Sequence, residues 1–300
     1  MKKSIKPSYN KKESLYGYLF ILPFVLGLGV FNFYAFFDNL YISLTNRKGF
    51  NKGKFIGFDN YAKLFKNEKF WQAFGNTFKY VIICVPFVIV LSILIAVLLN
   101  TKIKFKGLFR TLIFIPAVTM PAAIGLVWKW MMNYEYGLFN AFLEAIGLPR
   151  VAWLSDPSTV LISVSIVLIW CDVSQRMIVL LAGLQDIPSV YYEAADIDGA
   201  SKIRQFFSIT LPLLTPTTFF VTTMELIGVF QIFDFIYLMI PNGSSGVAAS
   251  RSVVTFFYEE AFKTGRKGNA AAISVVLFVI IMIVTIIQMK YKDRWVYEEA

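Results

Sequence analysis

Four stretches of this 300-residue sequence carry no formal charge and are long enough to cross a lipid bilayer as helices. A helix needs about 20 apolar residues to span the roughly 30 Å hydrocarbon layer. The charge-free stretches are residues 14–37, 80–99, 111–128 and 270–289. Two further stretches, 158–181 and 211–239, are apolar except for two charged residues in each. The sequence therefore predicts an all-α polytopic membrane protein with six transmembrane helices.

Composition supports this class and limits the chemistry. The chain is 57% hydrophobic and 16% charged, with a mean hydropathy of +0.62, which is typical of a membrane protein. It contains no histidine, which excludes histidine-based metal sites, Ser-His nucleophiles and imidazole proton relays. It also lacks a GxxxxGK[ST] nucleotide-binding loop. We therefore expect no catalytic residue, no metal site and no bound cofactor, and we expect any ATP and Mg to reside on a partner.

Basic residues predict the orientation and the boundaries. An even number of spans places both ends on one face, and that face carries a slight excess of Lys and Arg, which favours the cytoplasm. We expect a cytoplasmic segment at 1–15, a transmembrane domain at 16–290 and a cytoplasmic tail at 291–300. The first apolar stretch exceeds a signal-peptide core and lacks a small-x-small cleavage site, which indicates a retained helix. The net charge of +10 then fits a bilayer surface and not nucleic acid.

Two other features belong to the helices and the outer loops. Cys84 and Cys171 fall within predicted spans and are typical of buried free thiols. Prolines occur in several of the predicted spans, where they permit kinks. On the outer face, residues 138–146 have apolar side chains at helical spacing and are followed by Gly147, which predicts a short interfacial helix.

A polar elbow at about 186–212 separates the fourth and fifth predicted spans. Asp186 can cap a helix whose first turn contains Pro188, and Gly199 can end that helix in a left-handed turn. A second short helix is expected over 201–208. This helix, turn and helix would project from the membrane as a knob.

The side chains of the elbow allow two interpretations. Ala194, Ala195 and Ala200 are small enough for another surface to approach closely, and Glu193 and Asp198 offer charges for pairing. The alternative is a solvated cytoplasmic loop whose charges only keep it in water.

The elbow carries the strongest resemblance to a known family. Glu193-Ala194-Ala195, three residues, Gly199, nine residues and Ile209-x-Leu211-Pro212 resemble the EAA loop of the membrane subunits of binding-protein-dependent ABC importers. Further segments resemble the carbohydrate-uptake branch of this family, the permeases for maltose, multiple sugars and glycerol phosphate. They are YLFILP (18–23), FIGFDNYAKLF (55–65), FWQAFGNTF (70–78), GLFRTLIFIP (107–116), YGLFNAFL (136–143), WLSDP (153–157), LAGLQDIP (181–188) and FQIFD (230–234).

The resemblance implies a type I importer permease with a cytoplasmic coupling helix. Glu193 would pair with a basic group on a cytoplasmic ABC ATPase dimer, Ala194 and Ala195 would pack in its cleft, and Gly199 would set the bend. The ATPase-coupling residues would be Glu193, Ala194, Ala195, Asp198, Gly199, Ala200, Ile209, Leu211 and Pro212. A second, related permease subunit would complete a heterodimer, and an extracellular or lipid-anchored solute-binding protein would deliver the carbohydrate. The chain would then be a transport subunit in the plasma membrane and not an enzyme.

Polar residues within spans are costly and usually face a bundle interior or a wet cavity. Hydroxyl-rich ligands favour hydrogen-bonding groups beside aromatic rings. The substrate-pathway candidates are Trp170, Asp172, Gln175, Glu225, Phe230, Gln231 and Asp234. Two alternatives remain open for them: Asp172 and Arg176 have the i,i+4 spacing of an internal ion pair, and another carboxylate could bind the sister subunit.

A different class of function would use the same carboxylates. A proton-coupled secondary carrier could relay protons through Asp172, Glu225 and Asp234, and it would transport without nucleotide or the elbow. An embedded enzyme would need a nucleophile or a metal constellation, and the sequence offers neither. The elbow distinguishes the importer from the carrier.

Overall fold

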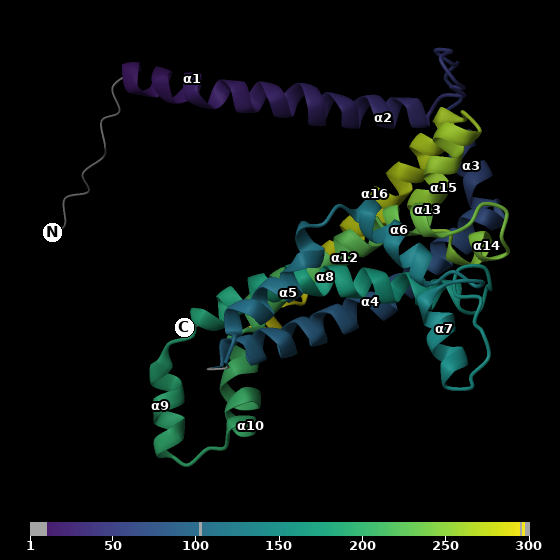
Figure 1. The fold of residues 1–300 in the computed structure, drawn as a ribbon. Coiled ribbons are helices and arrows are strands. Elements are labelled where there is room, and N and C mark those ends of the chain that lie inside the picture. The colour runs from purple at the N-terminus through teal and green to yellow at the C-terminus, as the bar shows by residue number, and fades with distance from the viewer. Residues whose placement is uncertain (1–10, 102–103, 295, 298–300) are drawn as a thin grey trace.

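The computed structural model describes residues 11–101, 104–294 and 296–297, and these residues are helical apart from loops and one isolated bridge between Thr45 and Phe55. Figure 1 shows the arrangement of the helices. Residues 1–10 and 298–300, which belong to the two predicted cytoplasmic segments, lie outside the described residues. The first helix begins at Lys11.

Five helices among the described residues are long and apolar enough to cross a membrane. They are Leu15–Ser43, Glu68–Asn100, Val160–Gln185, Thr215–Met239 and Lys267–Arg294. Each overlaps one of the six predicted stretches. The remaining predicted stretch, 111–128, corresponds to a bent pair of helices that adds a sixth span if the pair is counted as one. An all-helical fold with five or six spanning segments is therefore confirmed.

The helix bounds follow this order. The first long helix comprises α1 (Lys11–Leu28), a π-helical turn η1 (Gly29–Tyr34) and α2 (Ala35–Ser43), and it is followed by α3 (Asp59–Phe65), α4 (Glu68–Asn100), α5 (Lys106–Val118), α6 (Pro121–Met131), α7 (Leu138–Ala145) and α8 (Val160–Gln185). The second half comprises α9 (Ser189–Ile197), α10 (Lys202–Gln205), η2 (Phe206–Thr210), α11 (Leu211–Leu213), α12 (Thr215–Phe230), α13 (Asp234–Met239), α14 (Gly246–Ser250), α15 (Val253–Tyr258), η3 (Glu259–Lys263), α16 (Lys267–Lys290) and η4 (Lys292–Arg294).

The third predicted span is not a straight helix. α5 and α6 meet at an angle of 99°. Pro121 is the first residue of α6, and Met120 before it is extended with ψ of 131°. Proline lacks an amide hydrogen and disfavours helical geometry in the preceding residue, so the helix stops and restarts there. Pro116, which lies inside α5, causes no such break.

The fifth predicted span is also interrupted. α12 ends at Phe230 and α13 begins at Asp234, so residues 231–233 form a break in the helix. Gln231 and Asp234 lie within one predicted span, but the break prevents them from sharing one continuous helical face. The chain then returns through the short helices α14 and α15 before α16.

The core lies between α4 and α8, the most extensively packed helix pair. Their buried residues form one apolar cluster with α13 and a second with α12. A third cluster joins α4 to α15 and α16, with Phe70, Phe256 and Ile273 at its centre. Cys84 and Cys171 are buried free thiols, as predicted. The bundle is thus built around two of the predicted spans.

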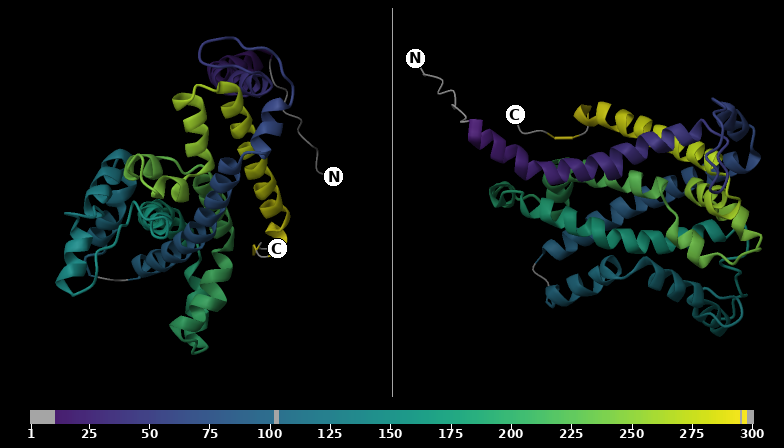
Figure 2. Two further views of the ribbon diagram at one scale, coloured as in Figure 1. Left: turned by 90° about the vertical axis from the view of Figure 1, so that its right-hand side faces the viewer. Right: turned by 90° about the horizontal axis from the view of Figure 1, so that it is seen from above.

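The first long helix contacts the bundle only at its end. α2 packs on α16, where the Asn39 amide donates to the Ser274 hydroxyl at 2.9 Å and the rings of Phe36 and Phe278 lie 5.2 Å apart. α1 diverges from the other helices (Figure 1). The start of α1, the end of α16 and the α9–α10 segment lie toward one end of the molecule (Figure 2). The helices α3, α7 and α14 lie at the other end (Figure 1).

Candidate functional site

The polar elbow folds as two short helices joined by a glycine turn. α9 ends in a Schellman motif, in which the Ala200 amide donates to the Ala195 carbonyl at 2.9 Å and the Gly199 amide donates to the Asp196 carbonyl at 3.1 Å. Gly199 has a φ of +74°, a conformation that β-carbons resist. Ser201 then caps α10, because its hydroxyl accepts a hydrogen bond from the Arg204 amide. The left-handed glycine turn that the sequence predicted is confirmed.

Side-chain hydrogen bonds hold the two helices of the elbow together. Lys202 Nζ lies 2.7 Å from Asp196 Oδ1, and Gln205 Nε2 donates to the same oxygen. The hydrogen bonds from Lys202 and then from Gln205 lower the pKa of Asp196 below its usual value. Gln205 is buried and also donates to the Ala200 carbonyl at 3.0 Å. The elbow is therefore an ordered unit and not a loosely solvated loop.

The start and the end of the elbow differ from the prediction. Asp186 does not cap α9, because its amide donates to the Ala182 carbonyl and so ends α8. α9 begins at Ser189, with Pro188 in the capping position and no side-chain cap. The second helix does not stop at 208, since α10 continues through η2 and α11 toward α12. The elbow is thus joined by nearly unbroken helix to the following span.

The elbow exposes most of its predicted coupling residues. α9 and α10 project from one end of the bundle (Figure 1). The exposed residues are Glu193, Ala194, Asp198 and Gly199, and the half-buried residues are Ala195, Ala200, Ile209, Leu211 and Pro212. The half-buried Ile209, Leu211 and Pro212 lie at the base, where the elbow joins the bundle. The projecting part of the elbow therefore presents the carboxylates of Glu193 and Asp198 and the small residues Ala194 and Gly199 at its surface.

The ion pair inside the bundle joins two helices and is not the i,i+4 pair that the sequence left open. Arg176 Nε on α8 lies 2.7 Å from Glu225 Oε2 on α12. The Glu225 side chain is fully buried, and 18% of the Arg176 side chain is exposed. Arg176 thus bonds across two helices and not to Asp172 four residues earlier, because the Glu225 carboxylate faces it directly from the neighbouring helix. This ion pair ties α8 to α12 within the membrane.

The other pathway candidates fall into two groups. Phe230 is buried, and its ring lies 5.4 Å from that of Phe78. Trp170 is 44% exposed and packs on Trp128 at 5.5 Å. Asp172 is half-buried, whereas Gln175, Gln231 and Asp234 are exposed. Phe230 and Glu225 are thus enclosed within the bundle, whereas the other candidates reach the surface of this chain.

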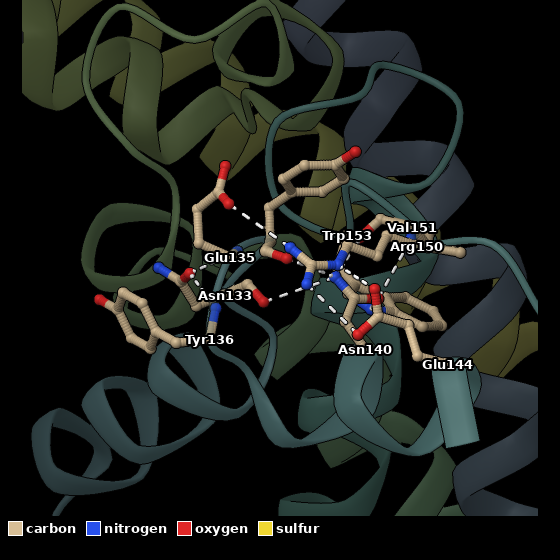
Figure 3. Close-up of polar contacts among 9 residues, drawn as sticks. Asn133, Glu135, Tyr136, Asn140, Glu144, Arg150, Val151 and Trp153 are labelled. Carbon is tan, nitrogen blue, oxygen red and sulfur yellow. Dashed lines mark hydrogen bonds and ion pairs between the residues drawn. The ribbon is translucent and has the colours of Figure 1, made fainter.

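The loop around α7, at the end of the molecule opposite the elbow, contains a polar centre that no sequence pattern indicated (Figure 3). Asn140 is buried and donates to the carbonyls of Tyr134 and Val151. Its Oδ1 accepts hydrogen bonds from the Val151 amide and from Trp153 Nε1, each at 3.0 Å. One side chain thereby fixes the loop on both sides of α7. A single Asn at a polar position of an amphipathic helix gives no signal of this role.

Arg150 adds ion pairs to the same loop. Arg150 forms ion pairs with Glu144 and, at 3.4 Å, with Glu135 (Figure 3). The hydrogen bond from Arg150 lowers the pKa of Glu144. The predicted short helix is confirmed as α7, and Gly147 follows it with a φ of +79°. This end of the molecule is therefore as ordered as the elbow.

A bundle of long apolar helices with an ordered polar knob at one end and a fixed loop at the other is the architecture of a polytopic membrane protein. Residues 60–296 match the family described as the binding-protein-dependent transport system inner membrane component, and the chain belongs to this family. The resemblance found in the sequence is thereby confirmed.

The relatives extend over almost the whole chain. The chain is 33% identical over 293 residues to the probable ABC transporter permease protein YesP of Bacillus subtilis, covering 97% of this chain and 94% of YesP. It is also 33% identical over 291 residues to the trehalose/maltose transport system permease protein MalF of Thermococcus litoralis, covering 97% and 98%. Among solved structures, a bacterial alginate ABC transporter in complex with an alginate pentasaccharide-bound periplasmic protein has a TM-score of 0.85, at 23% identity and 95% and 96% coverage. That likeness shows a shared fold.

Proposed function

We propose that this chain is the membrane-spanning permease subunit of an ATP-driven importer that moves an oligosaccharide delivered by an extracellular solute-binding protein. One observation carries the proposal: relatives that match nearly the full chain include permease proteins named for trehalose/maltose and arabinooligosaccharide transport. The ordered elbow adds support, because a proton-coupled carrier has no need of it. The proposal therefore favours the ATP-driven importer over the carrier.

The elbow is the proposed point of contact with a cytoplasmic ABC ATPase dimer, which would hold ATP and Mg. Glu193 and Asp198 present carboxylates at the exposed tip, and Ala194 leaves space for a close approach. The hydrogen bonds that Lys202 and Gln205 donate to Asp196 would keep the two helices together when the ATPase moves the elbow. Because α10 continues into α12, a push on the tip reaches the span that carries Glu225. ATP-driven movement of the ATPase would thus reorient the cavity as a rigid-body change.

A second, related permease subunit is the proposed partner within the membrane. The most apolar window of the first long helix, Leu15–Ser43, is not buried by the rest of this chain. Residues Phe20, Phe24 and Phe31 each expose more than two thirds of their surface. A heterodimer would bury part of this surface, and lipid would cover the rest. With the elbow on the ATPase side, both ends of the chain would lie in the cytoplasm.

The test of this function is uptake by the assembled transporter in membrane vesicles. We expect vanadate-sensitive, binding-protein-dependent uptake of an oligosaccharide, and we expect Glu193→Lys to reduce it at least tenfold while the permease still assembles in the membrane. Asp293→Lys is the matched control, because Asp293 is an exposed carboxylate toward the same end of the molecule but outside the elbow. Uptake driven by a proton gradient, insensitive to vanadate and to Glu193→Lys, would contradict the importer.

A further inference from the structure

The chain that follows the last span turns back onto the base of the elbow. α16 ends at Lys290, and the turn η4 follows it. The Val296 amide then donates to the Lys292 carbonyl at 3.0 Å, which keeps the chain folded against this turn. The Val296 side chain is only 8% exposed. We call residues 296–297 the C-terminal strap.

One hydroxyl group connects the strap to the elbow. Thr215 is the first residue of α12, directly after the elbow. The Tyr297 amide donates to Thr215 Oγ1 at 2.8 Å, and the same hydroxyl donates to the Pro212 carbonyl at 2.6 Å. Pro212 is one of the predicted coupling residues at the base of the elbow. The strap is thus bonded, through a single side chain, to the place where the elbow joins the next span.

The strap adjoins both chain segments that form the base of the elbow. Tyr297 borders a groove with Ile187 and Pro188, where the chain enters the elbow from α8. Tyr297 and Val296 also border a second groove with Phe207, on the segment by which the chain leaves the elbow toward α12. The end of α16, from which the strap extends, lies toward the same end of the molecule as the elbow (Figure 2). The strap is therefore placed at the entry and at the exit of the elbow.

The two spans that carry the elbow are in close contact at this level. A β-carbon on Gly183 of α8 would overlap the Thr217 side chain of α12, so the two helices approach each other as closely as glycine allows. The elbow is the only covalent link between these two helices. The strap adds α16 to the same junction, because it continues from that helix. Three spans are thus joined at the base of the elbow.

We propose that the C-terminal strap is a positioning element for coupling, which ties α16 to the base of the elbow and fixes the angle at which the elbow projects. This inference rests on the proposed function and adds a segment that acts through the elbow. Without the strap, the elbow keeps its internal hydrogen bonds but tilts about its base. Part of the ATPase movement is then lost before it reaches the spans.

The first measurement is the position of the elbow in the complete transporter in lipid nanodiscs. Spin labels on Ile197→Cys in α9, 87% exposed, and on Ile286→Cys in α16, 55% exposed, report the distance between the elbow and the last span. We expect one narrow distance distribution when the strap is intact. Val296→Asp places a charge in a buried position, which is costly, so the strap is released and the distribution should broaden or shift. An unchanged distribution in Val296→Asp would overturn the proposal.

The second measurement is the amount of sugar imported per ATP hydrolysed in proteoliposomes. The probes are malto- and arabino-oligosaccharides, offered with the solute-binding protein. We expect Val296→Asp to lower this ratio about fivefold, the lower end of the usual range of coupling between sites. Thr215→Val removes the hydroxyl that bonds the strap and should have a similar effect, whereas Thr215→Ser keeps the hydroxyl and should retain the wild-type ratio.

A neighbouring threonine provides the matched control. Thr218 borders the second groove but, among the described residues, makes no hydrogen bond to the strap, so Thr218→Val should leave the ratio unchanged. A loss in Thr215→Val with a wild-type ratio in Val296→Asp would assign the effect to the Thr215–Pro212 bond and overturn the strap. Failure of wild type to import any probe in an ATP-dependent way would contradict the proposed function. The spin-label distances would still decide whether the strap positions the elbow.

Discussion

At the residue scale, two glycines occupy the same backbone position at opposite ends of the molecule. Gly199 follows α9 and Gly147 follows α7, with φ of +74° and +79°. Both turns have the Schellman pattern, since the Leu148 amide donates to the Leu143 carbonyl at 2.8 Å as the Ala200 amide does to Ala195. A β-carbon at either position would meet no atom within 4 Å. The only cost of alanine there is backbone strain, about 1 kcal/mol.

This pair gives a matched test of the coupling role. We expect Gly199→Ala to lower ATP-driven uptake several-fold, because the strain acts on the turn that sets the angle between α9 and α10. Gly147→Ala carries the same strain at the outer end and should leave the coupling of ATP hydrolysis to uptake unchanged. The measurement is the ratio of sugar imported to ATP hydrolysed. Equal effects of the two substitutions would show that the elbow has no special part in coupling.

At the element scale, the sequence predicts where helices exist better than where they are continuous. Hydropathy records the length of an apolar run, and that run continues through the α5–α6 bend and through the break at 231–233. Pro116 and Pro121 both indicate a kink, but only Pro121 coincides with the 99° bend. The glycine turn of the elbow was predicted correctly, because such a turn is specified by neighbouring residues, whereas the start and the end of the elbow were not. The prediction that Asp186 caps α9 was wrong, because an aspartate can follow one helix as readily as it precedes another, and Asp186 follows α8.

The spacing of residues along the sequence does not predict which side chains of neighbouring helices will be in contact. The spacing left an Asp172–Arg176 pair open as an alternative, whereas Arg176 bonds to Glu225, which is 49 residues away. No periodicity indicates which carboxylate of a neighbouring helix will face an arginine. The hydrogen bonds of Asn140 were missed for the same reason, since their partners lie on both sides of α7. These features require the packed bundle.

The Arg176–Glu225 pair leads to a prediction about the α8–α12 contact. Arg176→Met leaves a fully buried carboxylate without its partner, so we expect the free energy of unfolding to fall by about 3–5 kcal/mol. Replacing both residues, as Arg176→Met with Glu225→Leu, should recover part of this loss, because the fully buried Glu225 carboxylate is removed together with its partner. Thermal unfolding of the purified transporter measures both effects. A double variant as unstable as the single one would show that the ion pair does not link these helices.

At the scale of the whole molecule, the two ordered ends give the protein a direction. The elbow occupies one end, and α7 with its loop occupies the other (Figure 1). The proposed ATPase contact thus lies at the opposite end of the bundle from the α7 loop. The slight excess of Lys and Arg on one face predicts that both ends of the chain lie in the cytoplasm, and this orientation can be measured directly.

Labelling of single cysteines measures this orientation. Ile197 in α9 is 87% exposed and Phe50 in the opposite loop is 97% exposed, so each accepts a cysteine without loss of packing. Cys84 and Cys171 are buried and should not react. We expect a membrane-impermeant maleimide to label Phe50→Cys in intact cells and Ile197→Cys only in inside-out vesicles. Labelling of Ile197→Cys from outside the cell would place the elbow on the wrong side for an ATPase.

The divergent first helix has a practical consequence for purification. Its apolar surface from Leu15 onward is left bare by the rest of the chain and joins the bundle only through α2. Any detergent that strips away lipid and neighbouring protein must coat this helix separately from the bundle, as a second micellar belt. Co-expression of the neighbouring subunit, or extraction into lipid nanodiscs, should therefore yield a more homogeneous sample than the chain isolated alone.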